Sequence, residues 1–595
     1  ITMAGFDPKI KIKSAIEKHS VNDLSGTTIT TLDFFKIQPT HIIECVPGAT
    51  YDIDLNAFTR CEAFVKPAFA DVKQENRFFF VPMRVIFKSW NDFITQNLTS
   101  VRDNAGSPSL YSPQVPYIYA ESLLACFIHY TDLAVLVVDG DGDFTYDGQN
   151  YSFTYKGRVA YQVLVGLGYR LDVNIQVPTT SPWDGGEVFN RLSALPLLAY
   201  CKIYFDFYQP TNIINAHRTW FQGLISDRLG VSDTYAPLKV SEVHTLLTYI
   251  SDLFYGHDYF TASFQEPYGN GQTVPTQQIL QPSGLSDFTQ QQVGSGTDSE
   301  PHLQSTLTST GSSQGLAYLT QKGLDLLKGI SDYVQRLVDS GFRPADRYKN
   351  RFGIDLSDAE LDQASYLGKS IQVLNIADVM STADTTGAGL GDYAGKGVFT
   401  QGKSDHIHLQ TKEYGYLICI TQIVPKIGYV QGRPRFMHHL NRFDFFSPEF
   451  DMAGNQAVYY DELYTGTLDG MYPGQRATQA FSYLPRYAEY KVGRDILGGD
   501  FSIGSRVAQL DSYHLFRLFG GSPYLIPGSS IDFTFLMADG VDYDRIFQSV
   551  DGSFDGFTSV LRFSIRCKFP GSKLFENYDF DGAREVSTLI GSSHM

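Results

Sequence analysis

The segment TYDIDLNAFTR, residues 50–60, alternates apolar and polar side chains with the period of a half-buried β-strand. Its apolar side chains share one face: Tyr51, Ile53, Leu55 and Ala57. The segment FTSVLRFSIRCKF, residues 557–569, repeats the pattern near the other end of the chain. Strand-forming segments thus open and close the sequence, which indicates a mainly β protein.

The sequence between these two segments predicts more strands, with helices and loops inserted among them. The run RFFFVPMRVIF is continuously apolar, as in a strand buried on both faces, and Pro82 breaks it. Further strands are predicted at 412–425, 481–492 and 531–537, and helical periodicity occurs at 187–206, 241–254 and 316–338. This order is typical of a β-sandwich with large loop insertions.

Composition limits the possible functions. The 595 residues include 37 Tyr, 43 Phe, 53 Gly and 26 Pro, which favours many short strands and turns. The 47 basic and 64 acidic residues give a net charge of −17. A protein this acidic does not bind nucleic acid over its whole surface, so any such contact must be local.

The spacing of the cysteines and the length of the apolar segments indicate in which cellular compartment the protein folds. No two of the six cysteines lie within fifteen positions of each other, so we expect buried thiols and neither a zinc site nor a disulfide framework. The first twenty residues lack the apolar stretch of a signal peptide, and we do not expect export. The most apolar window, 192–205, is too short to span a bilayer.

Three motifs resemble metal or catalytic sites only in part. The segment DGDGDFTYDGQN begins like a calcium loop but has Phe144 and Asn150 where that loop needs Gly and Glu, which favours a polar hairpin turn. The string 311–315 matches a nucleophile elbow but follows a polar run instead of a buried strand. His406 and His408 would share a strand face without a third ligand. We therefore predict no catalytic residue, no metal and no cofactor.

Two basic segments are candidates for nucleic-acid contact. In 557–569 the cations Arg562, Arg566 and Lys568 lie on the face opposite the apolar one. In GRPRFMHHLNRF (432–443), Arg433, Arg435 and Arg442 interleave with aromatic residues, among them Phe436. Aromatic rings among cations suit single-stranded nucleic acid, because bases stack on the rings while cations follow the phosphates. A loop that makes salt bridges and packs its aromatics is the alternative.

The block LNAFTRCEAFVKPAFADVKQENRFFFVPMRVIFKSWNDFI (55–94) resembles the N-terminal signature of microvirus major capsid proteins. The signature residues are Arg60, Pro67, Phe78 to Pro82, Arg84, Trp90 and Phe93. Further blocks that resemble the same family follow in order at 193–208, 258–263, 366–382, 413–435 and 481–492. The likeness is nearest to the gokushovirus-like branch, while the Asp/Gly-rich segment 132–155 departs from the family pattern.

The resemblance implies a single eight-stranded antiparallel jelly roll with long helical and loop insertions. It also implies that 60 copies build a T=1 shell around circular single-stranded DNA, without catalysis. The implied partners are further copies of the chain, the packaged DNA, a small basic DNA-binding protein and other minor capsid proteins. The protein would be assembled in the bacterial cytoplasm and reside in the virion.

The Gln/Ser/Thr-rich segment 264–315 occupies the place of the long insertion in that branch. No Lys or Arg occurs from 240 to 321, against seven carboxylates, so packaged DNA would repel this region. In the gokushovirus-like proteins the insertion forms a protrusion at the threefold axes. We expect three copies to pack through apolar residues and to contact a host surface receptor: Ile279, Leu280, Leu285 and Phe288.

The expected organisation follows from these observations. It has an N-terminal arm (1–30), two parts of the jelly roll (31–240 and 341–570), the insertion between them (241–340) and a C-terminal tail (571–595). A jelly-roll enzyme acting on carbohydrate and a non-capsid adhesin or spike are the alternatives. Particle size would discriminate them, because only a capsid protein forms a closed shell.

Overall fold

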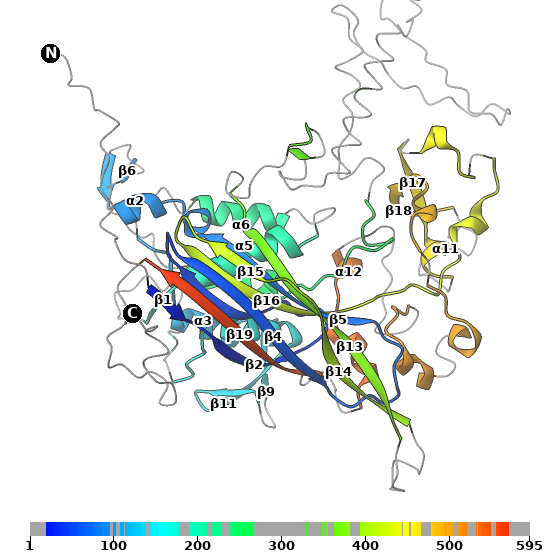
Figure 1. Cartoon of the computed structure of the whole chain (residues 1–595), viewed down its shortest axis with the longest axis horizontal. Helices are drawn as coiled ribbons and strands as arrows, with labels where there is room; N and C mark the ends of the chain where they lie inside the picture. Colours follow the sequence, from blue (N-terminus) through cyan, green and yellow to red (C-terminus); the bar gives the residue numbers. More distant parts are fainter. Residues whose placement is uncertain are drawn as a thin grey trace, which may run out of the picture.

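The structure is a computed structural model that describes most of residues 20–265 and 362–570 (Figure 1). The longest gaps within these ranges are 178–189, 228–237, 381–392, 466–477 and 520–530. Between 266 and 361 only residues 329, 348–349 and 352–354 are described. The helix predicted at 316–338 and the four apolar residues expected at the threefold axes lie outside the described residues, apart from Gly329 in that predicted helix.

A ten-stranded antiparallel sheet forms the centre of the molecule, in the order β1-β19-β4-β14-β13-β5-β16-β3, with β15 paired to β4 and β2 to β19. Its strands are β1 (Ser20–Asp23), β2 (Gly26–Leu32), β3 (Gln38–Cys45), β4 (Thr50–Cys61), β5 (Val72–Pro82), β13 (Ser365–Met380), β14 (Tyr393–Ser404), β15 (Ile407–Gln410), β16 (Gly415–Pro425) and β19 (Phe557–Phe569). The predicted mainly β, antiparallel class is confirmed. The predicted count of eight strands is not confirmed.

The two alternating segments that opened the sequence argument are direct neighbours. Phe557 to Lys568 of β19 pair without a break with Thr50 to Cys61 of β4. Between them the hydroxyls of Thr59 and Ser559 lie 2.7 Å apart and share a buried hydrogen bond. The first and last parts of the described chain are thereby joined in one sheet, and residues 20–32 extend it as β1 and β2 on the other edge of β19.

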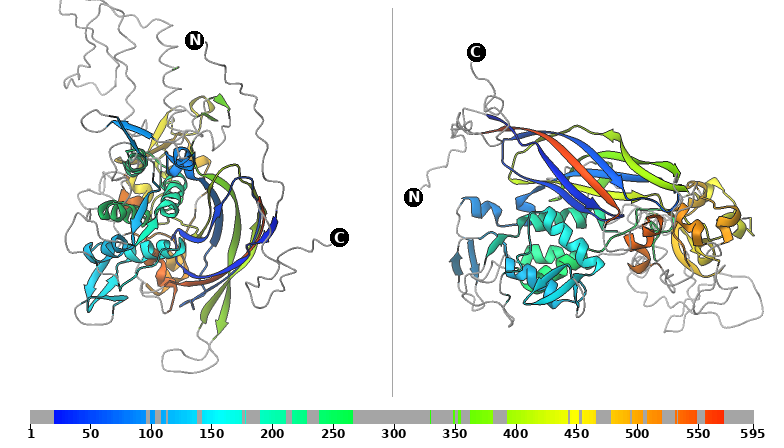
Figure 2. Two further views of the ribbon diagram at one scale, coloured as in Figure 1. Left: turned by 90° about the vertical axis from the view of Figure 1, so that its left-hand side faces the viewer. Right: turned by 90° about the horizontal axis from the view of Figure 1, so that it is seen from below.

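The sheet curls over an apolar interior, and the helices pack on one side of it (Figure 2). Apolar side chains of β4, β15 and β19 meet those of β3, β5 and β16 in this interior. β5 is buried on both faces, as predicted, since Phe78 and Phe80 join the interior while Phe79 and Val81 join the second core beneath the helices. The outer face of β4 and β19 therefore lies on the opposite side of the molecule from the helices.

Pro82 ends β5, and the helical layer follows. Its helices are α1 (Met83–Ile86), α2 (Trp90–Thr95), α3 (Ala120–His129), α4 (Tyr155–Gly166), α5 (Leu195–Ile203) continuing into a π-helical turn η1 (Tyr204–Tyr208), α6 (Ala216–Asp227) and α7 (Val240–Ile250). The helical segments predicted at 187–206 and 241–254 are confirmed in part, by α5 and α7. Residues 191–193 of the first segment form a strand instead, and 187–189 lie outside the described residues. None of the described helices has both the length and the apolar character needed to cross a membrane.

Smaller sheets of two or three strands accompany the helices. They are β6 (Thr99–Arg102) with β7 (Pro108–Tyr111), β8 (Tyr117–Tyr119) with β12 (Arg191–Ser193), and β9 (Ala134–Val137), β10 (Phe144–Tyr146) and β11 (Gln149–Phe153). The hairpin predicted within 132–155 is present as β10 and β11, which turn at Asp147 and Gly148, both at positive φ.

A lobe at one end of the molecule is built from residues 426–496 (Figure 1). Its elements are η2 (Arg435–His438), η3 (Pro448–Phe450), β17 (Asn455–Tyr459), α11 (Tyr460–Leu463), β18 (Ala480–Pro485) and η4 (Ala488–Tyr490). The segment that follows, up to β19, holds η5 (Gly499–Ile503), η6 (Ala508–Tyr513), α12 (Phe533–Leu536) and η7 (Gly540–Ile546).

The strand predicted at 531–537 is wrong, because residues 533–536 form the short helix α12. Phe535 is almost fully buried, with its ring centroid 5.0 Å from that of Phe481. Ile531 and Leu536 are also almost fully buried, so tertiary packing overrides the alternating pattern. All six cysteines are free thiols, as expected.

Candidate functional site

The three cations of β19 lie on the exposed face of the sheet, as predicted. Arg562, Arg566 and Lys568 are exposed, while Leu561, Phe563, Ile565 and Cys567 between them are buried in the interior of the curl. Among the described residues, no carboxylate comes within ion-pair distance of these three cations. The structure therefore brings together a row of solvent-facing cations on the side of the molecule away from the helices.

Neighbouring strands place carboxylates beside this row. Arg566 lies directly opposite Asp52 of β4 and Asp23 of β1, and Ser564 lies opposite Asp54. Directly opposed side chains in an antiparallel pair have Cβ atoms about 4.5–5.5 Å apart. The exposed face is consequently mixed in sign, although β19 itself contributes only cations.

Two histidines next to β4 complete this face. His408 Nδ1 lies 2.6 Å from an Asp52 oxygen, and His406 Nδ1 lies 2.8 Å from an Asp54 oxygen. The hydrogen bond and the charge of Asp54 raise the pKa of His406. Protonation of His406 would leave Asp54 less able to offset the cations of β19, so the net charge of this face depends on pH.

The basic segment 432–443 lies in the lobe, where buried carboxylates hold two of its cations. The guanidinium of Arg433 donates to both oxygens of Asp461, at 2.8 and 2.9 Å. The guanidinium of Arg435 donates to Glu462 at 2.7 Å and to the carbonyl of Ala457 at 2.6 Å. Asp461 and Glu462 are adjacent in α11, so one turn of helix holds both cations.

Glu462 is the centre of this network. One of its oxygens also accepts the backbone N–H of Tyr459 at 3.0 Å, and the other accepts the hydroxyl of Tyr259 at 3.1 Å. The guanidinium of Arg435 lies 4.8 Å from the ring centroid of Tyr459. A buried charge with several hydrogen bonds and a stacked partner holds loops in place. Arg433 and Arg435 therefore form the salt bridges expected if the segment 432–443 is a structural loop, the alternative to a DNA-binding segment.

Several other residues of this segment face solvent, whereas the side chains of His438 and His439 are largely buried. Phe436 and Arg442 are exposed, and a cavity of about 440 Å³ lies beside Phe436. Tyr490 and Val492, from the other end of the lobe, line the same cavity. The structure therefore combines exposed aromatic and apolar side chains with cations that are already paired.

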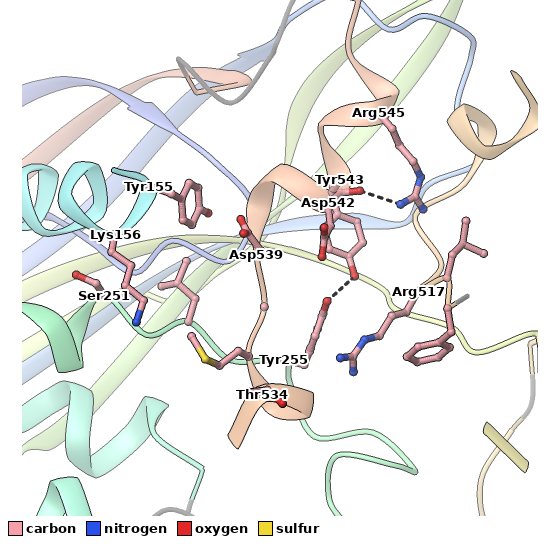
Figure 3. A pocket seen from close by; sticks show the side chains of 15 residues that line it. Tyr155, Lys156, Ser251, Tyr255, Arg517, Thr534, Asp539, Asp542, Tyr543 and Arg545 are labelled. Atoms are coloured by element: carbon pink, nitrogen blue, oxygen red, sulfur yellow. Dashed lines mark hydrogen bonds between the residues drawn. The ribbon is translucent and has the colours of Figure 1, made fainter. Parts of the chain in front are cut away.

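A second cavity, of about 360 Å³, lies between α4, α7 and the segment 517–545 (Figure 3). Sequence analysis did not single out its residues, because they come from four distant segments. Arg517 was the one available signal, since it is a lone cation in the apolar run HLFRLF. Its guanidinium lies 4.4 Å from the ring centroid of Tyr255 and 4.2 Å from that of Phe535.

The polar groups of this cavity hold its walls together. The guanidinium of Arg545 donates to four backbone carbonyls, those of Asp511, His514, Phe516 and Asp542. Lys156 reaches Asp252 at 2.7 Å, and the hydroxyl of Tyr543 donates to that of Tyr255 at 3.1 Å. Burial raises the pKa of Asp542 to about 6, and the charge of Asp539 adds to this shift. These contacts hold together the chain segments that line the cavity, which indicates a structural role for its polar residues.

Within the described part of the chain, no group of three or more His, Cys, Asp or Glu side chains is placed to hold a metal ion. Asp143, which the calcium-loop pattern included, accepts a hydrogen bond from the backbone N–H of Phe153. Asp139 and Asp141 lie outside the described residues.

Comparison with known proteins finds relatives that match most of the chain. A family model described as capsid protein (F protein) matches residues 10–127 and 185–570. The capsid protein VP1 of Chlamydia phage 1 is 24% identical over 564 residues, which cover 87% of this chain and 89% of that protein. The capsid protein VP1 of Bdellovibrio phage phiMH2K is 22% identical over 526 residues, covering 85% and 87%. The unmatched stretch 128–184 includes the divergent segment 132–155.

Proposed function

The chain belongs to the capsid protein (F protein) family, and on this premise we propose that 60 copies of it form a closed T=1 icosahedral shell around circular single-stranded DNA. The family match over both halves of the chain carries this conclusion. Its role as a phage capsid protein is structural, not enzymatic, in line with the two VP1 relatives. The curled antiparallel sheet supports the same reading, since jelly rolls are a common architecture of viral capsids.

Particle mass tests the shell. Sixty chains of 66.5 kDa would form a particle of about 4 MDa under closed point-group symmetry. Light scattering of the purified assembly should give this mass, and a reducing agent should leave it unchanged because all six cysteines are free thiols. A small oligomer would contradict the proposal.

For the DNA contact, we favour the outer face of β19 over the segment 432–443. Arg562, Arg566 and Lys568 are exposed and have no ion pair among the described residues, so they can exchange their counterions for phosphates. The guanidiniums of Arg433 and Arg435 already bind Asp461 and Glu462. With a net charge of −17, a separate small basic protein would supply further neutralisation, and other minor capsid proteins would complete the virion.

For host attachment, the candidate is the insertion 264–315. The insertion begins at Phe264, beside the lobe: the backbone N–H of Phe264 donates a hydrogen bond to the carbonyl of Tyr483 in β18. Its lack of cations favours a position outside the shell, away from DNA. Deleting 270–310 should leave assembly intact and abolish adsorption to the bacterium. Particles that lack this segment yet adsorb and infect normally would end this part of the proposal.

A further inference from the structure

The lobe exposes large apolar side chains that its own core does not use. Six of them are 47–85% exposed: Phe436, Leu440, Phe445, Phe446, Tyr490 and Ile496. We call these six residues the lobe surface. The core of the lobe is closed without them, since Val458, Tyr460 and Phe481 are almost fully buried. The lobe surface is therefore not an unfinished part of the fold.

Ring contacts and a shared cavity connect much of the lobe surface. The ring of Phe446 lies 5.7 Å from that of Tyr490, and the ring of His439 bridges Phe445 at 5.4 Å and Tyr490 at 6.1 Å. Phe436 and Tyr490 line the cavity of about 440 Å³. Leu440, which follows His439 in the chain, projects furthest into solvent.

The area of the lobe surface is that of an interface. A whole aromatic side chain offers roughly 150–250 Å², so the six residues together expose on the order of 700 Å². The largest apolar patch of a typical monomer is about 300–600 Å², whereas each side of a stable interface buries about 800 Å². An exposed apolar surface of this size is typical of an interaction site.

The charges around the lobe surface indicate the kind of partner. Arg433 and Arg435 are paired with Asp461 and Glu462, Lys491 with Asp451 at 2.7 Å, and Lys426 with Asp495 at 3.0 Å. These paired cations offer little to phosphate, whose binding depends on the release of counterions. The exposed apolar side chains therefore favour an apolar protein surface as the partner.

We propose that the lobe surface is a contact between neighbouring copies of this chain in the shell, an inference that rests on the proposed shell function. A copy of the chain is present wherever a shell assembles, and the lobe provides both a highly exposed side chain, Leu440, and a cavity beside Tyr490. Burying this surface supplies association free energy without any change of charge.

The test compares two matched double variants of the purified chain without DNA or other proteins. Leu440→Ser with Phe445→Ser should lower the yield of particles of about 4 MDa at least tenfold. Val135→Ser with Leu136→Ser alters two exposed apolar side chains in β9, outside the family match, and should assemble normally. Wild-type yield from the lobe variant would overturn the inference. If the wild-type chain itself forms no shell, the proposed function fails as well.

If the lobe variant unfolds, its low particle yield would not test the contact. A thiol-labelling experiment then tests whether the lobe surface is buried between copies in the shell. In Leu440→Cys the new thiol is exposed, whereas five of the six native cysteines are buried and Cys61 is only partly exposed. The thiol should react readily in unassembled chains and be protected at least tenfold in empty shells. Equal reactivity in both would contradict a contact between copies. Protection that appears only in DNA-filled particles would assign the surface to nucleic acid and would equally overturn the inference.

Discussion

The outer face of β19 and the segment 433–442 each carry three cations among apolar residues, but their carboxylate neighbours differ. In the lobe, Asp461 and Glu462 reach Arg433 and Arg435 from a buried helical turn and bind them directly. On β19, Asp52 and Asp23 lie beside Arg566 without forming an ion pair with it. The sequence of a segment thus shows how many cations it carries. Whether these cations can bind phosphate depends on carboxylates that other parts of the chain place beside them.

The largest expected effect concerns the buried pair in the lobe. Glu462→Ala leaves Arg435 buried without its carboxylate and removes an acceptor from Tyr459 and Tyr259. Breaking such a pair costs about 3–5 kcal/mol. Hydrogen exchange of the β17 and β18 amides should show this loss. The corresponding change on the sheet, Asp52→Ala, should cost less than about 1 kcal/mol because its charge is exposed. If both variants lost the same free energy of unfolding, the carboxylates of the lobe and of the sheet would not differ in how tightly they bind their partners.

An intermediate effect concerns DNA. Replacing Arg562, Arg566 and Lys568 with Gln should lower the DNA content of particles while empty shells still form. The slope of log binding constant against log salt concentration should become shallower by about 2, because three phosphate contacts to a single strand are lost. Arg433→Gln is the matched control and should leave the slope unchanged, since that cation is held by Asp461. An unaltered DNA content in the triple variant would reject the assignment.

The smallest effect concerns the histidines beside β4. Because Asp54 raises the pKa of His406 in the folded protein, the charged pair stabilises the fold below pH about 6.5, the unfolded value. That contribution disappears as pH rises through the folded-state pKa. His406→Gln should therefore lower the free energy of unfolding at pH 5.5 by a few tenths of a kcal/mol, and leave it unchanged at pH 8, as measured by denaturant unfolding. The opposite pH dependence would show that His406 does not act through Asp54.

Much of the sheet could be predicted from local patterns, because alternation at 50–60 and 557–569 sets both the strand and its buried face. The same patterns could not show that these strands pair, since their contact joins residues some 500 positions apart. For the same reason the partners of Arg433 and Arg435 were not apparent, as Asp461 and Glu462 belong to a different element. The strand predicted at 531–537 failed because burial of Phe535 in a helical turn outweighs a weak alternation.

Ultraviolet cross-linking of DNA-filled particles, followed by mass spectrometry of the cross-linked peptides, tests the difference between the two basic regions most directly. The account predicts cross-links to the outer face of β19, with Lys568 among the modified residues, and none to 433–442. Cross-links concentrated in 433–442, with β19 unmodified, would contradict it.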